Sequence, residues 1–292
     1  MSHFFRVQNR AGHAYKTHNQ HVSDPTSTPD DVLAYYGSNV ESDRLAVGKG
    51  ALEFERTKEI ILRFLQPGSA IADIGGATGR YAEWLASNGH RVDLVDPVPL
   101  HVELARRLAG DPPRFGVHLG DARTLPFVAG SFDAVLLLGP LYHLEEEHDR
   151  ADAVREAMRV CRRGGLIFAA AISRFAPLLN SICRGEAIDE QVFANVQAET
   201  LTGHRVPEDR RTSQFPEAYY HLPSEFTDEL TEAGLDVQGI YGIEGPGWLL
   251  NDIETTWLEA DARERILWAA RALETDPNLI AVSDHFLAVA TT

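Results

Sequence analysis

Short apolar runs alternate with amphipathic segments between residues 69 and 172, and this alternation restricts the possible folds more than any other feature of the chain. The apolar runs, which we predict to be strands, are 69–74, 91–95, 116–119, 132–138 and 165–172. The amphipathic segments between them, which we predict to be helices, are 81–87, 100–108 and 149–161. Nearly continuous apolar strands are typical of strands covered on both faces. Their alternation with helices predicts an α/β fold with a doubly wound, mostly parallel sheet.

The segments outside this alternation divide the rest of the chain. Residues 1–28 are predicted to be a flexible N-terminal tail, and 29–66 a cap with helices at 30–36 and 51–65. The core is predicted over 67–292, with a helix at 224–233 and further strands at 235–243 and 285–290. Two irregular, partly helical insertions, 173–222 and 244–280, follow the carboxyl ends of strands, where α/β sheets bind their ligands. We therefore expect these insertions to form a helical lid.

Composition and charge restrict the class of protein. The formal net charge is −16, which disfavours nucleic acid as a partner because nucleic-acid binders usually carry a basic surface. The apolar runs are too short to span a bilayer, and no signal peptide is expected, so we predict no membrane partner. The two cysteines, Cys161 and Cys183, cannot form a disulfide framework, which fits a cytoplasmic location. Cys161 is expected on the buried side of helix 149–161.

A glycine-rich turn joins the first predicted strand to the next helix. It reads Asp73, Ile74, Gly75, Gly76, Ala77, Thr78 and Gly79. A nicotinamide-binding fingerprint starting at Gly75 would need glycines at positions 77 and 80, where this chain has Ala77 and Arg80. A phosphate-binding P-loop is also absent, because Gly48-Lys49 is followed by Gly50 rather than by Ser or Thr. The turn instead fits the pattern D-x-G-x-(G/A)-x-G.

A carboxylate at the end of the second predicted strand lies in register with this turn. Asp96 occupies a position where an acidic side chain can accept hydrogen bonds from both hydroxyls of a ribose. Asp93 is the rival candidate, but it lies mid-strand on the opposite face. We therefore predict Asp96 to be the ribose ligand.

With these motifs the chain resembles the class I S-adenosylmethionine (AdoMet)-dependent methyltransferases. Further matches are Gly120-Asp121-Ala122 after the third strand, Ser131-Phe132-Asp133-Ala134-Val135 at the fourth, Arg162-Arg163-Gly164-Gly165 before the fifth, and the run from Leu138 to Leu144. The resemblance covers about residues 69–172 and is weak beyond them. It implies a Rossmann-like seven-stranded sheet whose last strand is antiparallel. One departure is Ala77, which stands where the family usually has a middle glycine, but alanine is nearly as small.

The resemblance also implies roles for individual residues. The loop of Gly75, Gly76, Ala77, Thr78 and Gly79 would pass beneath the methionine part of AdoMet, and Asp73 would hold its ammonium group. Asp96 would bind the ribose, and Asp121 the adenine amino group with the Ala122 backbone beside it. Pro97 and Leu138 complete the implied cofactor contacts.

Methyl transfer requires alignment of the reacting groups and exclusion of water, and a base only when the acceptor must lose a proton. His143, which follows the fourth strand, is our first candidate for the base, and His221 and Tyr220 in the predicted lid are the others. No group of residues shows a metal-ligand spacing, so no metal is expected.

The predicted function is transfer of a methyl group from AdoMet to oxygen, nitrogen or carbon of a small molecule such as a secondary metabolite, by a chain that could form a homodimer. One alternative is a protein that binds AdoMet or another nucleoside without catalysis. A second is a methyltransferase for RNA or protein. The net charge argues against RNA, and Gly139-Pro140-Leu141-Tyr142 replaces the Asn/Asp-Pro-Pro-aromatic motif of many enzymes that methylate amino groups of nucleic acids.

Overall fold

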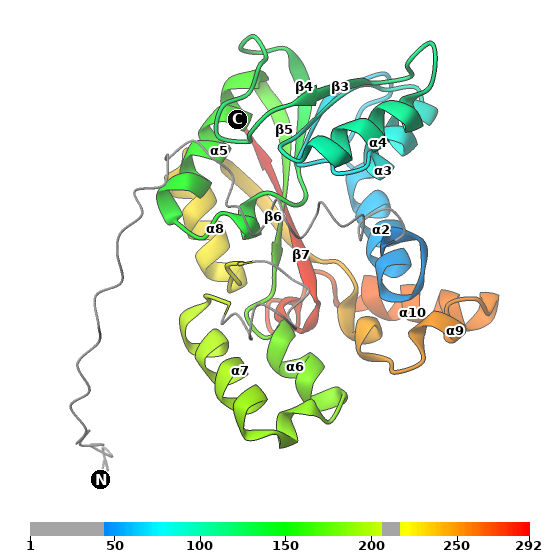
Figure 1. Ribbon diagram of the computed structural model, residues 1–292, viewed down its shortest axis with the longest axis vertical. Coiled ribbons are helices and arrows are strands. Elements are labelled where there is room, and N and C mark those ends of the chain that lie inside the picture. The colour runs from blue at the N-terminus through cyan, green and yellow to red at the C-terminus, as the bar shows by residue number, and fades with distance from the viewer. Residues whose placement is uncertain (1–43, 206–216) are drawn as a thin grey trace.

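A computed structural model describes residues 44–205 and 217–292 of the chain. The predicted tail 1–28 and the predicted helix 30–36 lie outside these residues. The described part contains a seven-stranded sheet (Figure 1). Its strands are β1 (Ala70–Ile74), β2 (Arg91–Asp96), β3 (Gly116–Leu119), β4 (Phe132–Leu137), β5 (Cys161–Ile172), β6 (Asp236–Gly242) and β7 (His285–Thr291).

The strand order in the sheet is β3-β2-β1-β4-β5-β7-β6. Strands β1 to β5 are parallel to one another, whereas β7 pairs antiparallel with both β5 and β6. The predicted Rossmann-like sheet with an antiparallel last strand is therefore confirmed. Because β7 is inserted between β5 and β6, its first residue, His285, lies opposite Ile172 at the carboxyl edge of the parallel strands.

The fifth strand begins earlier than expected. Cys161, predicted to lie on a helix, is the first residue of β5 and pairs with Phe132 of β4. Its backbone is already extended, with φ −74° and ψ 140°, because the preceding helix ends at Val160. The Cys161 thiol is buried as expected, and burial raises its pKa to about 11.

The α-helices of the described residues cover both faces of the sheet and its carboxyl edge. They are α2 (Gly48–Leu62), α3 (Arg80–Ser87), α4 (Pro99–Ala109), α5 (Glu147–Val160), α6 (Ala176–Cys183), α7 (Glu190–Thr202), α8 (Pro223–Glu232), α9 (Ile253–Thr256) and α10 (Ala260–Leu273). Alternate residues of each strand face opposite layers. Ala72 and Ile74 of β1 join the core formed with α5 and α8, while Ile71 joins the core formed with α2, α3 and α4. These two helical layers lie on opposite sides of the sheet in Figure 1.

The two insertions leave the carboxyl edge of the sheet. The first carries α6 and α7, and the second carries α9 and α10, all of which lie below the strands in Figure 1. Main-chain hydrogen bonds join the first insertion to the core, among them those from Tyr219 N–H to Tyr142 O (2.9 Å) and from His221 N–H to Ile172 O (2.9 Å).

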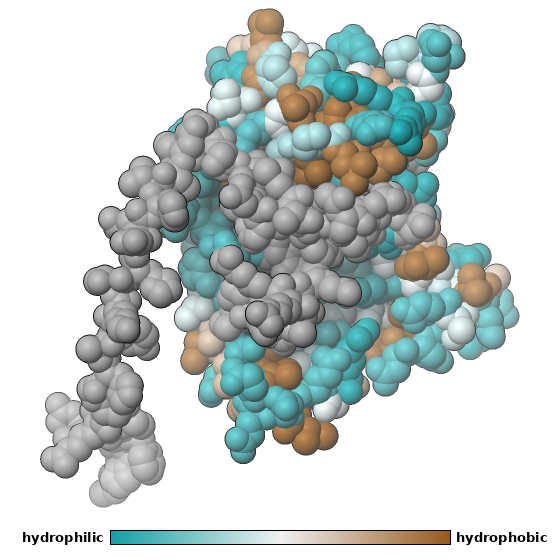
Figure 2. Space-filling view, in the orientation of Figure 1, coloured by the Kyte–Doolittle hydropathy of each residue, from teal (hydrophilic) through white to brown (hydrophobic). Residues whose placement is uncertain are grey.

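The visible face of the described residues is mostly hydrophilic, and its apolar residues gather in the upper half near α4 (Figure 2). Within residues 44–205 and 217–292, no helix combines the length and the apolar character that crossing a bilayer requires.

Candidate functional site

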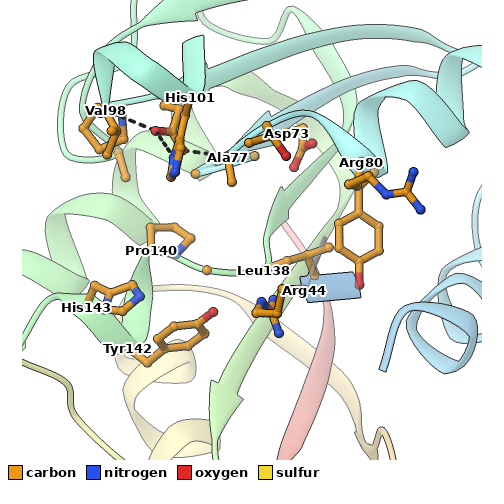
Figure 3. Close-up of a pocket in the computed structure, with 18 of the residues that line it drawn as sticks. Arg44, Asp73, Ala77, Arg80, Val98, His101, Leu138, Pro140, Tyr142 and His143 are labelled. Atoms are coloured by element: carbon orange, nitrogen blue, oxygen red, sulfur yellow. Dashed lines mark hydrogen bonds and ion pairs between the residues drawn. The ribbon is translucent and has the colours of Figure 1, made fainter. Parts of the chain in front are cut away.

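A cavity of about 1000 Å³, including its open mouth, lies at the carboxyl edge of β1, β2 and β4. Figure 3 shows Asp73 and Ala77 on one side of it and Tyr142 and His143 on the other. Most of the predicted site residues contribute to its wall, namely Asp73, Gly75, Gly76, Ala77, Thr78, Asp96, Pro97, Asp121, Ala122, Leu138 and His143. The fold thus brings together residues from four separate strand ends.

The glycine loop needs small residues at specific positions. Gly75 has φ 69° and Ala77 has φ 47°, which are left-handed conformations that glycine adopts with least strain. A Cβ at Gly76 would lie 2.6 Å from Oδ2 of Asp73, so a larger residue there would displace that carboxylate. Gly79 does not line the cavity, but it precedes α3 with φ 91° and packs near Phe115. The loop therefore holds its backbone close to the cavity.

Asp96 is held in the cavity wall by three donors. Its Oδ1 accepts hydrogen bonds from Val98 N–H (2.9 Å) and from the His101 imidazole (3.0 Å), and its Oδ2 accepts one from Ala77 N–H (2.9 Å). The three donor residues are labelled in Figure 3. The rival residue, Asp93, does not line the cavity and pairs with His118 at 2.9 Å. The geometry therefore favours Asp96 over Asp93 as the ribose ligand.

Asp73 is a buried carboxylate with no ion-pair partner among residues 44–205 and 217–292. Its Oδ2 has no hydrogen-bond partner among the described residues. Burial, and secondly the charge of Asp96, raise the pKa of Asp73 to about 7. A cationic ligand beside Asp73 would remove this penalty. The ammonium group of AdoMet, the cofactor that the sequence resemblance implies, fits this requirement.

We expect cofactor binding to be coupled to ionisation of Asp73. Below pH 7 the free protein must lose this proton before Asp73 can pair with an ammonium group. The affinity for S-adenosylhomocysteine should therefore rise by up to about tenfold per unit between pH 5.5 and 7, and fall again only at alkaline pH, where the amino group of the ligand loses its charge. Isothermal titration calorimetry across this range measures the effect. An Asp73→Asn variant should lose the dependence below pH 7, and a flat wild-type profile there would contradict the assignment.

Asp121 is oriented by an arginine that the sequence analysis did not identify. The Asp121 carboxylate accepts hydrogen bonds from the Arg123 guanidinium at 2.9 and 2.8 Å and from the Arg123 N–H at 2.8 Å. Arg123 also binds Asp149 of α5 at 3.0 Å. This arrangement holds Asp121 at the adenine end of the predicted cofactor site.

His143 is the catalytic candidate that the structure places at the cavity. It ends the 3-10 helix η3 (Leu141–His143), directly after β4, and is half-buried. Its Nδ1 lies 3.4 Å from the carbonyl oxygen of Glu217, and its ring stacks edge-on against Tyr142 at 4.7 Å. A proton on Nδ1 would leave Nε2 as the basic nitrogen.

The other two catalytic candidates lie elsewhere. Tyr220 is 5% exposed and packs against Tyr142, Ile172 and Trp248, and burial raises its pKa to about 12. His221 is fully buried, with Nε2 3.3 Å from Glu229, and burial lowers its pKa. Neither side chain lines the cavity formed by the described residues. Of the three candidates, His143 is thus the one that lines the cavity formed by the described residues, and it stays the first candidate for the base.

The cavity wall also contains an ion pair from the N-terminal segment that the sequence analysis missed. Arg44 binds both oxygens of Glu53, at 2.5 and 3.2 Å, and both residues line the cavity. Behind them, His285 Nδ1 lies 2.8 Å from Glu244. Burial disfavours the charged form of His285, but the carboxylates of Glu53, Glu244 and Asp284 outweigh it and raise the His285 pKa to about 9. The imidazole is therefore protonated at neutral pH.

The carboxylates and imidazole of Glu53, Glu244 and His285 are close enough to hold a metal ion, with candidate ligand atoms within 4.8 Å of one another. However, Arg44 already pairs with Glu53, and a protonated imidazole cannot ligate a metal. We therefore expect a chelator such as EDTA to leave methyl transfer unchanged. If EDTA abolished the reaction and magnesium restored it, this cluster would be the first place to seek the metal.

Comparisons with known proteins agree with this geometry. A family model described as a methyltransferase domain matches residues 72–169. The chain is 39% identical over 111 residues to a ubiquinone biosynthesis O-methyltransferase of Methylocella silvestris, a match covering 37% of this chain and 41% of the relative. It is 36% identical over 108 residues to a probable tRNA methyltransferase 9B of Bos taurus, covering 36% of this chain and 22% of that protein. The matches thus span about two fifths and one fifth of the lengths of these relatives.

Among solved structures, a SAM-dependent methyltransferase of Methanosarcina mazei has the same fold, with a TM-score of 0.55 and 17% identity. The superposition covers 80% of this chain and 96% of that one. The strand order, the glycine loop and the matched domain lead to one conclusion. Residues 72–169 of this chain match a methyltransferase domain, and the described part of the chain has the fold of a SAM-dependent methyltransferase.

Proposed function

We propose that the protein transfers the methyl group of AdoMet to an oxygen, nitrogen or carbon atom of a small-molecule acceptor, such as a secondary metabolite. The observation that carries this proposal is the chemistry of the cavity. Asp73, a buried carboxylate that pairs with no cation in the described part of the chain, lies beside a glycine loop and a second carboxylate, Asp96, that is already oriented by backbone donors. This combination complements the ammonium group and ribose of AdoMet.

When bound, AdoMet supplies an activated methyl group. The residues of this chain align the acceptor with that group, exclude water and provide a proton acceptor. Leu45, Leu138 and Leu144 give the cavity apolar surface that excludes water. His143 lies on the opposite side from Asp73, where its imidazole can take a proton from the acceptor.

Two observations favour a small acceptor over a macromolecule. The net charge of −16 disfavours binding to RNA. The first insertion is bonded to Tyr142 and His143, which line the cavity, and we expect it to restrict the acceptor to a small molecule. The matches to the relatives named for ubiquinone biosynthesis and for tRNA methylation cover only 37% and 36% of this chain, so they do not identify its acceptor.

The decisive experiment combines cofactor binding with an acceptor screen. We expect calorimetry to show binding of both AdoMet and S-adenosylhomocysteine. A labelled-methyl assay should then show incorporation into small-molecule extracts but not into undermodified tRNA or peptides. Binding without transfer to any pool would favour the non-catalytic alternative, and label in tRNA or peptide would favour the macromolecular one. If neither ligand produced heat of binding, the central proposal would fail.

Two further expectations concern the setting of the protein. Both cysteines are free, Cys161 buried and Cys183 exposed, which agrees with the proposed cytoplasmic location. A homodimer also remains a proposal, which sedimentation analysis can test.

A further inference from the structure

We propose that Arg150 of α5 is the positioning residue for His143. In this role it clamps the loop after β4 against the lid strip, residues 217–221, and so determines where the imidazole lies in the cavity. The inference rests on the proposed function, because it assigns a means of control to the same site. Arg150 itself does not line the cavity that the described residues form.

The first part of the clamp is a pair of hydrogen bonds to the main chain just after His143. Nη1 of Arg150 donates to the carbonyl oxygens of Leu144 (2.9 Å) and Glu145 (2.7 Å). Arg150 is only 3% exposed, so these bonds are shielded from water. A guanidinium that holds two consecutive carbonyls restricts the backbone on the carboxyl side of His143.

The second part of the clamp is the anchoring of Arg150 itself. Its Nε lies 2.8 and 3.1 Å from the two carboxylate oxygens of Glu229 on α8. The same carboxylate lies 3.3 Å from Nε2 of His221. A charge this deeply buried requires such a partner, and together the two fix the direction of the guanidinium.

The third part joins the loop to the lid strip. The Arg150 guanidinium lies over the ring of Tyr219, 4.3 Å from its centroid. The Tyr219 N–H donates to the carbonyl oxygen of Tyr142 (2.9 Å), and the Glu217 carbonyl lies 3.4 Å from Nδ1 of His143. Arg150 and the lid strip therefore both hold the turn that carries the imidazole.

This arrangement predicts an effect on turnover that is separate from cofactor binding. Asp73 and Asp96, which are predicted to bind the cofactor, lie at the ends of β1 and β2. Among the described residues, neither forms a hydrogen bond or an ion pair with Arg150. An Arg150→Lys variant keeps the charge but cannot reproduce the planar set of donors. We expect it to lower kcat by about 10- to 100-fold, because small displacements of a catalytic group have effects of this size. The dissociation constant of S-adenosylhomocysteine should stay within about twofold.

The matched control is Arg155→Lys, on the same helix, where the arginine is 60% exposed and pairs with Asp152. A double-mutant comparison then tests whether Arg150 acts through His143. If it does, R150K should slow the wild type but not slow H143A further. An unchanged kcat in R150K, a parallel loss of S-adenosylhomocysteine affinity, or effects that multiply in the double variant would each overturn the proposal.

Hydrogen–deuterium exchange gives a readout that needs no acceptor. R150K should accelerate exchange of the Tyr219 N–H and of amides in residues 141–146 by about tenfold or more, as expected when a local closed state loses stability, while R155K should not. If R150K is too unstable to purify, Tyr219→Leu removes the stacking partner and should accelerate exchange in 141–146. Unchanged exchange in these segments would overturn the clamp even if methyl transfer were established. Conversely, faster exchange in a protein that transfers no methyl group would support the clamp and refute the proposed function.

Discussion

Replacing His143 with alanine is expected to lower kcat by about 10²–10⁴-fold, the usual contribution of a general base. The imidazole lines the cavity on the side opposite to Asp73. Its Nδ1 lies near the Glu217 carbonyl, which favours a tautomer with a basic Nε2. The change removes the proton acceptor but none of the residues predicted to hold AdoMet. The Michaelis constant of the acceptor should therefore change much less than kcat.

The measurement is a pH profile of kcat for wild type and H143A with the acceptor that the screen identifies. Wild-type kcat should fall as the imidazole becomes protonated at low pH, and this limb should be missing from H143A. His148→Ala is the matched control, because His148 is nearby in sequence and its side chain is 69% exposed. An H143A enzyme with wild-type kcat at every pH would remove His143 from the mechanism and leave alignment as the source of catalysis.

Replacing Asp96 with alanine is expected to weaken the binding of AdoMet and S-adenosylhomocysteine by about 1–3 kcal/mol, or about 5- to 150-fold. The ligand hydroxyls would lose a charged acceptor. The three groups that Asp96 holds, Ala77 N–H, Val98 N–H and the His101 ring, would lose theirs as well. Since Ala77 belongs to the glycine loop, we expect the loss to lie in the upper half of this range.

Asp93→Ala is the control for this experiment. Asp93 is on the same strand, but its partner is His118 and it does not line the cavity. Calorimetry should give an unchanged dissociation constant for D93A. A D93A variant that weakens binding as much as D96A would show that the effect comes from damage to β2 rather than from the ribose contact.

Much of the fold could be predicted from the sequence because its signals are local. Five strands were predicted from apolar runs between residues 69 and 172, and the structure has strands in all five places. The glycine loop and the role of Asp96 could also be predicted from the sequence. A turn with left-handed residues needs glycine or a small substitute such as Ala77, and Asp96 follows from where β2 ends. In a parallel sheet these strand ends must lie at one edge, so the cofactor side of the cavity could be deduced without coordinates.

The opposite wall of the cavity was decided by tertiary packing. No spacing in the sequence indicates that Arg44 and Glu53 reach the cavity, because they come from a segment that precedes β1. The burial of Tyr220 and His221 could not be predicted from the sequence either. It depends on main-chain hydrogen bonds from the lid strip to Tyr142 and Ile172.

The sequence by itself therefore determined the sheet, the glycine loop and the carboxylates at the strand ends. These features depend on periodicity and backbone conformation over a few neighbouring residues. Only the tertiary structure decided that His143 faces the cavity and that Arg150 holds its loop against the lid strip. The contacts of Arg150 with Glu229 and Tyr219 join segments far apart in the chain, and their geometry arises only when helices α5 and α8 pack on the sheet.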